Sequence, residues 1–139
     1  MLSGGLPHNR CMSPKQQQRL SRVVWFELPA LDLDRATRFY ETILDTKLRR
    51  ETMGLVDLAV FPYEAPGIGG CLIKGEQFKP GNGSVVYLNA DPTLATVRSR
   101  VEAAGGKILM PDVTLPGDMG IYTWIEDTEG NTVGLHALV

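Results

Sequence analysis

The 139-residue sequence lacks the features that mark several large classes of protein. It has only two cysteines, Cys11 and Cys71, which exclude a disulfide framework and a CxxC zinc motif. No apolar run approaches the roughly 20 residues needed to span a bilayer, and the polar N-terminal segment has no hydrophobic stretch typical of a secretory signal. We therefore expect a cytoplasmic protein with no membrane association.

An excess of charge of one sign is also missing. The formal net charge is -2, charged residues make up 22% of the chain, and the two signs are interspersed. This balance gives no electrostatic reason to expect nucleic acid as a partner. The sequence also has no GxGxxG motif, P-loop, nucleophile elbow or zincin motif, so no short motif assigns it a chemistry.

The residues that are present predict one folded domain after a polar leader. The apolar fraction of 43% and the chain length suit a single globular domain with a real core. Residues 1–21 are rich in Ser, Gln, Gly and Pro and show no hydrophobic period, which predicts a disordered or loosely held leader. We expect the folded domain over residues 22–139.

Within that domain, one order of elements occurs twice. Apolar residues at helical spacing after Asp32 predict a helix that this aspartate caps. Asp91 follows Asp32 by 59 positions and is expected to cap a second helix, with Pro92 at its first position. β-Branched and aromatic runs predict strands at 23–28, 47–52, 55–61 and 70–73, and again at 84–89, 107–110, 121–126 and 132–138. The duplication predicts modules at about 22–76 and 83–139.

Three segments carry a resemblance to a known family. Trp25–Pro29 followed by Asp32–Tyr40 is similar to the opening strand and helix of vicinal oxygen chelate proteins, and Val101–Lys107 is similar to the exit of their second helix. Glu126–His136 resembles their final hairpin. On these segments the chain is identified as a member of the superfamily of glyoxalase I, bleomycin resistance proteins and extradiol dioxygenases. It most resembles the subgroup of predicted enzymes related to lactoylglutathione lyase.

The resemblance implies an α+β fold. Two βαβββ modules would pair into a curved, partly open mixed β-barrel with the helices outside, and the concave face would form a cleft. The modules of this family often pair across a subunit interface, so a homodimer is expected. In metal-dependent members, His, Glu, Gln or Asp side chains on the first and last strand of each module hold a divalent ion in the cleft.

At the positions that the resemblance assigns to these ligands, the chain departs from the metal-dependent members. The positions fall on Trp25, on Val85 (or Ser84 if the register is shifted by one residue), on Gly134 and on the segment Gly70–Ile73. Tryptophan, valine and glycine side chains cannot ligate a metal, and Cys71 is the one candidate ligand in the last segment. We therefore predict no metal cofactor, with a divalent metal at the displaced ligands Glu27 and His136 as the alternative.

Strand alternation assigns seven side chains to the cleft. They are Trp25, Glu27, Tyr87, Tyr122, Trp124, Glu126 and His136. An aromatic lining with a few polar groups is typical of a small-molecule pocket. Alternatively, the two tryptophans fill a closed barrel interior, because aromatic side chains fill interiors readily.

Glu27 and His136 are the candidate catalytic residues. A carboxylate on a central strand is costly to bury without a partner, and His136 is the best candidate for that partner. Such a pair could perform acid–base chemistry, or it could form a structural hydrogen bond that orients the two strands. The loop 111–120 is dense in glycine and proline and is expected to form a mobile rim over the cleft.

Three functional hypotheses follow from the residues and the resemblance. The first is a metal-independent protein that binds a small molecule in the aromatic cleft. The second is a metal-dependent lyase or isomerase of the lactoylglutathione lyase type that uses displaced ligands. The third is a drug-binding resistance protein that sequesters its ligand without chemistry. The sequence names no substrate and leaves open whether the chain is an enzyme.

Overall fold

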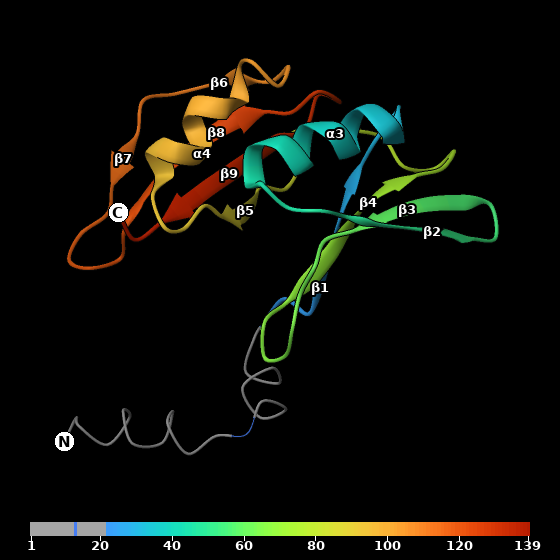
Figure 1. Cartoon of the computed structure of the whole chain (residues 1–139), viewed down its shortest axis with the longest axis horizontal. Coiled ribbons are helices and arrows are strands. Elements are labelled where there is room, and N and C mark those ends of the chain that lie inside the picture. Colours follow the sequence, from blue (N-terminus) through green and yellow to red (C-terminus); the bar gives the residue numbers. More distant parts are fainter. Residues whose placement is uncertain (1–12, 14–21) are drawn as a thin grey trace.

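The computed structural model describes Ser13 and residues 22–139, so the predicted leader lies outside the described residues apart from Ser13. In chain order the elements are β1 (Trp25–Pro29), α3 (Leu33–Leu44), β2 (Arg49–Met53), β3 (Val56–Val60), β4 (Gly69–Lys74), β5 (Val86–Asn89), α4 (Leu94–Val101), β6 (Lys107–Ile108), β7 (Val113–Thr114), β8 (Ile121–Glu126) and β9 (Thr132–Ala137) (Figure 1). Neither α3 nor α4 has the length and apolar character needed to cross a membrane.

The two sheets repeat one topology. The first has the strand order β1-β4-β3-β2, and the second has the order β5-β9-β8-β6, with β7 also paired to β8. In each sheet the opening strand runs parallel to its neighbour, β1 to β4 and β5 to β9, while the other pairs are antiparallel. Over the described residues neither sheet closes on itself. This confirms the predicted α+β fold of two βαβββ modules that leave the barrel open.

Helix α3 forms where the sequence predicts it. The Asp32 side chain accepts a hydrogen bond of 3.0 Å from the backbone N–H of Arg35, which caps the helix. Asp45 ends it in the left-handed conformation, with φ at 51°. The residues that the helix buries are Leu33, Ala36, Thr37, Phe39, Tyr40 and Ile43.

The cap of the second helix differs from the prediction. Helix α4 begins after Thr93, whose hydroxyl oxygen accepts a hydrogen bond of 3.3 Å from the backbone N–H of Thr96. Asp91 instead accepts a hydrogen bond of 3.2 Å from the backbone N–H of Leu138, just after β9. The predicted cap at Asp91 is wrong because a tertiary contact takes that carboxylate, and Pro92 accordingly precedes the helix.

Both helices lie on the same side of the sheets and pack against each other (Figure 1). α3 contacts β3 and β4, while α4 contacts β6, β8 and β9. Buried residues of both modules form one core cluster, which includes Leu28 and Leu72 of the first sheet, Leu135 of the second, and Phe39 and Val101 of the helices. The modules therefore share a core instead of folding around two separate ones.

Glu129, in the turn between β8 and β9, joins the two modules. Its side chain is fully buried, and its carboxylate accepts hydrogen bonds of 2.8 Å from the backbone N–H groups of Leu31 and Asp32. Arg35 adds two side-chain hydrogen bonds, of 2.7 and 3.0 Å. Burial disfavours the charged carboxylate, but these donors outweigh it and lower the pKa of Glu129 to about 2.

Asp127 strengthens the same turn. Its carboxylate accepts hydrogen bonds of 2.7 Å from the Tyr40 hydroxyl and of 2.8 and 2.9 Å from the backbone N–H groups of Glu129 and Asn131. The Asn131 side chain donates a further hydrogen bond of 2.7 Å to the Pro29 carbonyl, at the end of β1. The polar residues of this turn therefore hold the first module against the second.

One strand is absent from the sequence prediction. β7 lies inside the segment 111–120 that the sequence predicts as a loop, and it pairs with β8 through Val113 with Tyr122 and Thr114 with Ile121. A strand of two residues is too short to show hydrophobic alternation, so no local pattern indicates it. All the strands that the sequence does predict are observed. Most have shifted ends, whereas the predicted strand 121–126 coincides with β8.

Candidate ligand-binding faces

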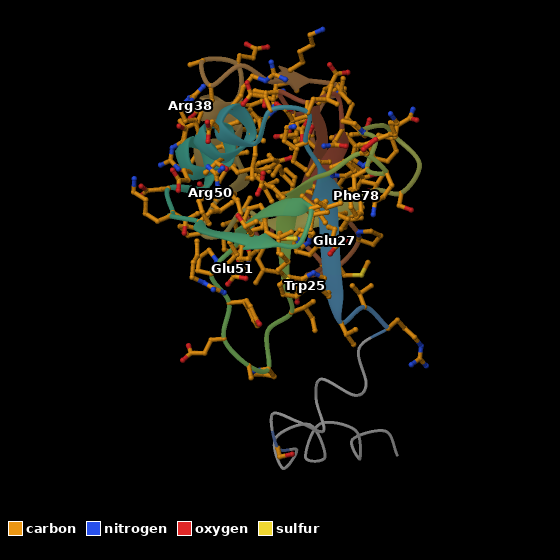
Figure 2. The ribbon with its side chains drawn as sticks, turned by 90° about the vertical axis from the view of Figure 1, so that its right-hand side faces the viewer. Trp25, Glu27, Arg38, Arg50, Glu51 and Phe78 are labelled. Atoms are coloured by element: carbon orange, nitrogen blue, oxygen red, sulfur yellow. The ribbon has the colours of Figure 1, made fainter. Side chains whose placement is uncertain are left out.

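We refer to the side of each sheet that faces away from the helices as its open face. On β1 the side chains alternate as predicted, because Leu28 is buried in the core under the helices while Trp25 and Glu27 are exposed on the other side. Figure 2 shows Trp25 and Glu27 along β1. The open faces are therefore where the side chains predicted for a cleft lie.

Three aromatic side chains gather on the open face of the second sheet. The indole Nε1 of Trp124 donates a hydrogen bond of 2.7 Å to the Tyr87 hydroxyl, and the rings of Tyr87 and Tyr122 meet edge to face with their centroids 5.6 Å apart. Gly134 makes this arrangement possible, because a Cβ atom there would lie 2.3 Å from the Tyr87 ring. We refer to Tyr87, Tyr122 and Trp124 as the aromatic cluster.

A related aromatic contact lies on the first sheet. The rings of Trp25 and Tyr63 meet edge to face with centroids 5.7 Å apart, and we refer to them as the aromatic pair. The Tyr63 ring covers Gly69, where a Cβ atom would lie 2.4 Å from it. Sequence reasoning missed Tyr63 because it lies in the loop after β3, where strand alternation gives no side-chain direction.

Beside the aromatic pair, the open face of the first sheet is apolar and buried. Its cluster consists of Leu58, Val60, Cys71 and Ile73, with Val56 and Phe78 packed against them. Burial raises the pKa of the Cys71 thiol to about 11, and the nearby Glu27 carboxylate adds to the rise. The thiol is therefore neutral and inert at physiological pH, like that of a small buried hydrophobe.

The structure does not form the pair expected between Glu27 and His136. The Nε2 atom of His136 lies 2.6 Å from the carbonyl oxygen of Met119, in the loop between β7 and β8. Glu27 makes no hydrogen bond or ion pair with any described residue. The reason is topological, because β9 pairs with β5 and β8 whereas β1 belongs to the other sheet. The catalytic roles of these two residues stay predictions.

Glu126, also predicted for the cleft, has a cation beside it. It lies half-buried at the end of β8, and its Oε2 atom is 3.9 Å from the Nζ atom of Lys107 on the neighbouring strand β6. A partly exposed pair at this distance contributes little to stability. It does reduce the charge that Glu126 offers to a ligand.

The side chains at the family's metal-ligand positions do not fit a metal. The Tyr87 ring fills the space over Gly134, and Trp25 packs against Tyr63. Over the described residues there is no group of three or more His, Cys, Asp or Glu side chains that could hold a metal ion, so Glu27 and His136 do not belong to one. A catalytic zinc needs about three protein ligands, which these positions do not supply.

Residues of the edge strands β1 and β5 together line two clefts, and we refer to the boundary between these two strands as the seam. One of about 240 Å³, the seam cleft, is lined by Glu27, Leu28, Pro29, Lys79, Gly81, Gly83, Ser84, Val86, Asn131 and Thr132. The other, of about 330 Å³, is apolar and is lined by Val23, Phe26, Ile68, Val85, Val86 and Tyr87. Of the seven side chains predicted for one cleft, Glu27 therefore lines the first of these and Tyr87 the second.

Two open sheets of repeated topology, with paired helices on one side, define a glyoxalase-like fold. The family described as Glyoxalase/Bleomycin resistance protein/Dioxygenase superfamily matches residues 22–135, and the chain belongs to this superfamily. A glyoxylase-like domain-containing protein from Didymella fabae is 32% identical over 116 residues, which cover 80% of this chain and 89% of that protein.

Solved structures of low sequence identity share the fold. A glyoxylase/bleomycin resistance protein/dioxygenase domain from Frankia sp. EAN1pec has a TM-score of 0.63 at 20% identity. The match covers 85% of this chain and 98% of the Frankia chain. A genomically encoded fosfomycin resistance protein from Listeria monocytogenes has a TM-score of 0.60 at 16% identity, over 85% of this chain and 93% of its own. A mutant of glyoxalase I from Zea mays has a TM-score of 0.61 at 22% identity over 82% of this chain, which spans only 45% of the maize chain.

Proposed function

We propose that the protein binds a small organic molecule on the open faces of its sheets without a resident metal. The aromatic cluster over Gly134 carries this proposal, because a ring stands where the family resemblance places a metal ligand. Tyr87 is 47% exposed and Trp25 is 38% exposed, so a large part of both rings is open to contact. Exposed aromatic surface beside a few polar groups favours contact with an organic ligand.

In this proposal Glu27 and His136 supply separate polar contacts to the ligand. The Glu27 side chain has no hydrogen-bond or ion-pair partner among the described residues, whereas the His136 ring is already bonded to the Met119 carbonyl. A few polar groups in an aromatic site orient a ligand and give specificity. A ligand that engaged His136 would therefore also affect the loop that carries Met119.

We further propose a homodimer. The aromatic pair includes Tyr63, which is 54% exposed, and the cluster includes Tyr87, so rings of both sheets face outward from the single chain. A second copy placed over these faces would enclose them and complete a cleft. Light scattering of the full chain is expected to give twice the mass of one chain, and a monomer at all concentrations would contradict this.

Tryptophan fluorescence tests the binding proposal directly. The sequence has only two tryptophans, Trp25 and Trp124, and they lie in the aromatic pair and the aromatic cluster. Titration with a panel of aromatic acids, amines and neutral aromatics is expected to give a saturable change for at least one compound. Trp25→Phe and Trp124→Phe each remove one of the two tryptophans. The variant that loses the fluorescence change identifies the sheet whose tryptophan senses the ligand.

Two variants separate specific binding from surface adsorption. Tyr87→Ala is expected to weaken binding by about tenfold, which corresponds to the loss of one good aromatic contact. Leu55→Ala, at a fully exposed residue between β2 and β3, is expected to leave it unchanged. Equal effects of the two substitutions, or no saturable change with any compound, would refute the proposal.

Two further measurements decide against the alternatives. Elemental analysis of protein purified without chelator is expected to show no stoichiometric metal. Stoichiometric nickel or zinc that is lost in Glu27→Ala or His136→Ala would instead support a metal-dependent lyase or isomerase. Calorimetric titration with a bleomycin-type drug is expected to show no binding at micromolar protein, and heat of binding there would support drug sequestration.

A further inference from the structure

We propose that the seam cleft binds a small zwitterion of the α-amino acid class. Glu27 would receive the ammonium group of the ligand and Lys79 its carboxylate. The lining of the cleft shares Glu27 with the proposed function, but it includes none of the aromatic pair or the aromatic cluster. The inference therefore goes beyond the proposed function and adds a second site.

Two opposite charges line this cleft without neutralising each other. Glu27 comes from β1, and Lys79 comes from the segment that links the two modules. Neither side chain forms a hydrogen bond or an ion pair with any residue that the structure describes. The cleft therefore presents an unmatched carboxylate and an unmatched ammonium group to one small ligand, and charge-assisted hydrogen bonds to both would be among the stronger ones available.

The wall that carries Lys79 is held in place by the second module. The backbone N–H of Gly81 donates a hydrogen bond of 3.2 Å to Asn131 Oδ1, and the Gly81 carbonyl accepts one of 3.2 Å from the backbone N–H of Thr132. The Asn131 Nδ2 atom also donates to the carbonyl of Pro29, at 2.7 Å, and to Asp127 Oδ2, at 2.9 Å. Asn131 is thus a positioning residue that connects β1, the linker and the final turn around the cleft, and such pre-organisation lowers the cost of binding.

Size and chemistry of the cleft favour a ligand as small as an amino acid. Its volume of about 240 Å³ is below the roughly 300–1,000 Å³ of pockets that enclose drug-sized ligands. Ser84 and Thr132 add hydroxyl groups to the lining, and no atom lies within 4 Å of a Cβ placed at Gly83. A ligand with only one charge would leave the other protein charge unmatched, so the zwitterion is expected to bind best.

Calorimetry and ligand-observed NMR on the full chain test this inference with matched ligands. L-Alanine is compared with ethylamine, which lacks the carboxylate, and with propionate, which lacks the ammonium group; L-glutamine tests the tolerance for a longer side chain. We expect saturable binding of at least one of the two amino acids and binding of each single-charge analogue that is weaker by about tenfold or more.

Neutral variants of the two charged residues complete the test. Glu27→Gln and Lys79→Gln are each expected to weaken amino acid binding by about tenfold, with unchanged circular dichroism because both side chains are exposed. Lys74→Gln, at an exposed lysine that lines a different cleft, is the matched control and is expected to bind normally. No binding of either amino acid, binding of ethylamine as tight as that of L-alanine, or normal binding by both Glu27→Gln and Lys79→Gln would overturn the inference.

The tryptophan titrations distinguish a failure of this inference from a failure of the proposed function. If amino acids fail to bind while an aromatic ligand still saturates the fluorescence change, the inference about the seam cleft is wrong and the proposed function stands. If amino acids bind with the expected dependence on charge while no aromatic ligand does, the proposed function is wrong and the seam cleft is the binding site.

Discussion

The ring of Tyr87 lies on Gly134, so close that a Cβ atom at residue 134 would be 2.3 Å from it. The two residues are register partners on the parallel strands β5 and β9. The resemblance places a metal-ligand position at residue 134, so a ligand side chain there and the present position of the Tyr87 ring exclude each other. In the first module the Tyr63 ring likewise covers a glycine, Gly69, but it does so from the loop after β3.

Gly134→Ala is expected to destabilise the protein by about 1–3 kcal/mol, because the new methyl group must displace the Tyr87 ring. In a Tyr87→Ala background the same substitution should be nearly neutral, which a double-mutant cycle of urea unfolding would measure. Gly83→Ala is the control, since no atom lies within 4 Å of a Cβ there. Additive effects of Gly134→Ala and Tyr87→Ala would contradict this account.

Stability is expected to fall in acid through Glu129. Its pKa is about 2 in the folded protein against the ordinary value of 4.5. Because the folded pKa is depressed, its contribution is fully present above about pH 4.5 and is lost as the pH falls toward 2, up to about 3 kcal/mol. Urea unfolding at a series of pH values measures this. Glu129→Gln should lower stability at neutral pH and flatten the acid dependence, whereas Glu64→Gln, at an exposed loop residue, should do neither.

Tyr40→Phe is expected to cost about 1–3 kcal/mol, because it removes a buried hydroxyl that donates a hydrogen bond of 2.7 Å to Asp127. Chemical unfolding measures the loss. Tyr63→Phe serves as the comparison, since the Tyr63 ring is 54% exposed and its hydroxyl has no hydrogen-bond partner among the described residues. Similar, small losses in both variants would show that the Asp127 network does not hold the modules together.

Cys71 is expected to resist alkylation in the folded protein at about pH 8, because the thiol is buried and its pKa is raised to about 11. The measurement uses a Cys11→Ser background, so that Cys71 is the only thiol. Iodoacetamide labelling followed by mass spectrometry should show modification only after guanidinium unfolding. Rapid labelling of the native protein would mean that the apolar cluster on the first sheet opens.

Thr93→Ala is expected to destabilise the protein by about 1 kcal/mol, because it removes the acceptor that caps α4. Asp91→Ala should instead disturb the segment just after β9, because the Asp91 carboxylate accepts a hydrogen bond from the backbone N–H of Leu138 there. Hydrogen exchange distinguishes the two: loss of protection at Thr96 is expected only in Thr93→Ala. Loss of protection at Thr96 only in Asp91→Ala would instead indicate that Asp91 caps α4.

The sequence by itself determined the elements and their order, because these depend on neighbouring residues. The alternation of Ile121, Thr123 and Ile125 with polar and aromatic residues predicts β8 with both of its ends. The same period of two predicts that Trp25 and Glu27 lie opposite Leu28. Asp32 and the helical spacing after it predict where α3 starts.

Only the tertiary structure decided which of these side chains meet. Alternation assigns a side chain to a face of its sheet, but it does not say which strand lies beside it, so the separation of Glu27 from His136 could not be predicted. The contact that keeps Asp91 from capping α4 and the contacts of the buried Glu129 carboxylate depend on partners 47 and 94 to 98 positions away. The seam cleft likewise depends on how Lys79 and the linker fold back toward β1, a long-range contact that no local pattern encodes.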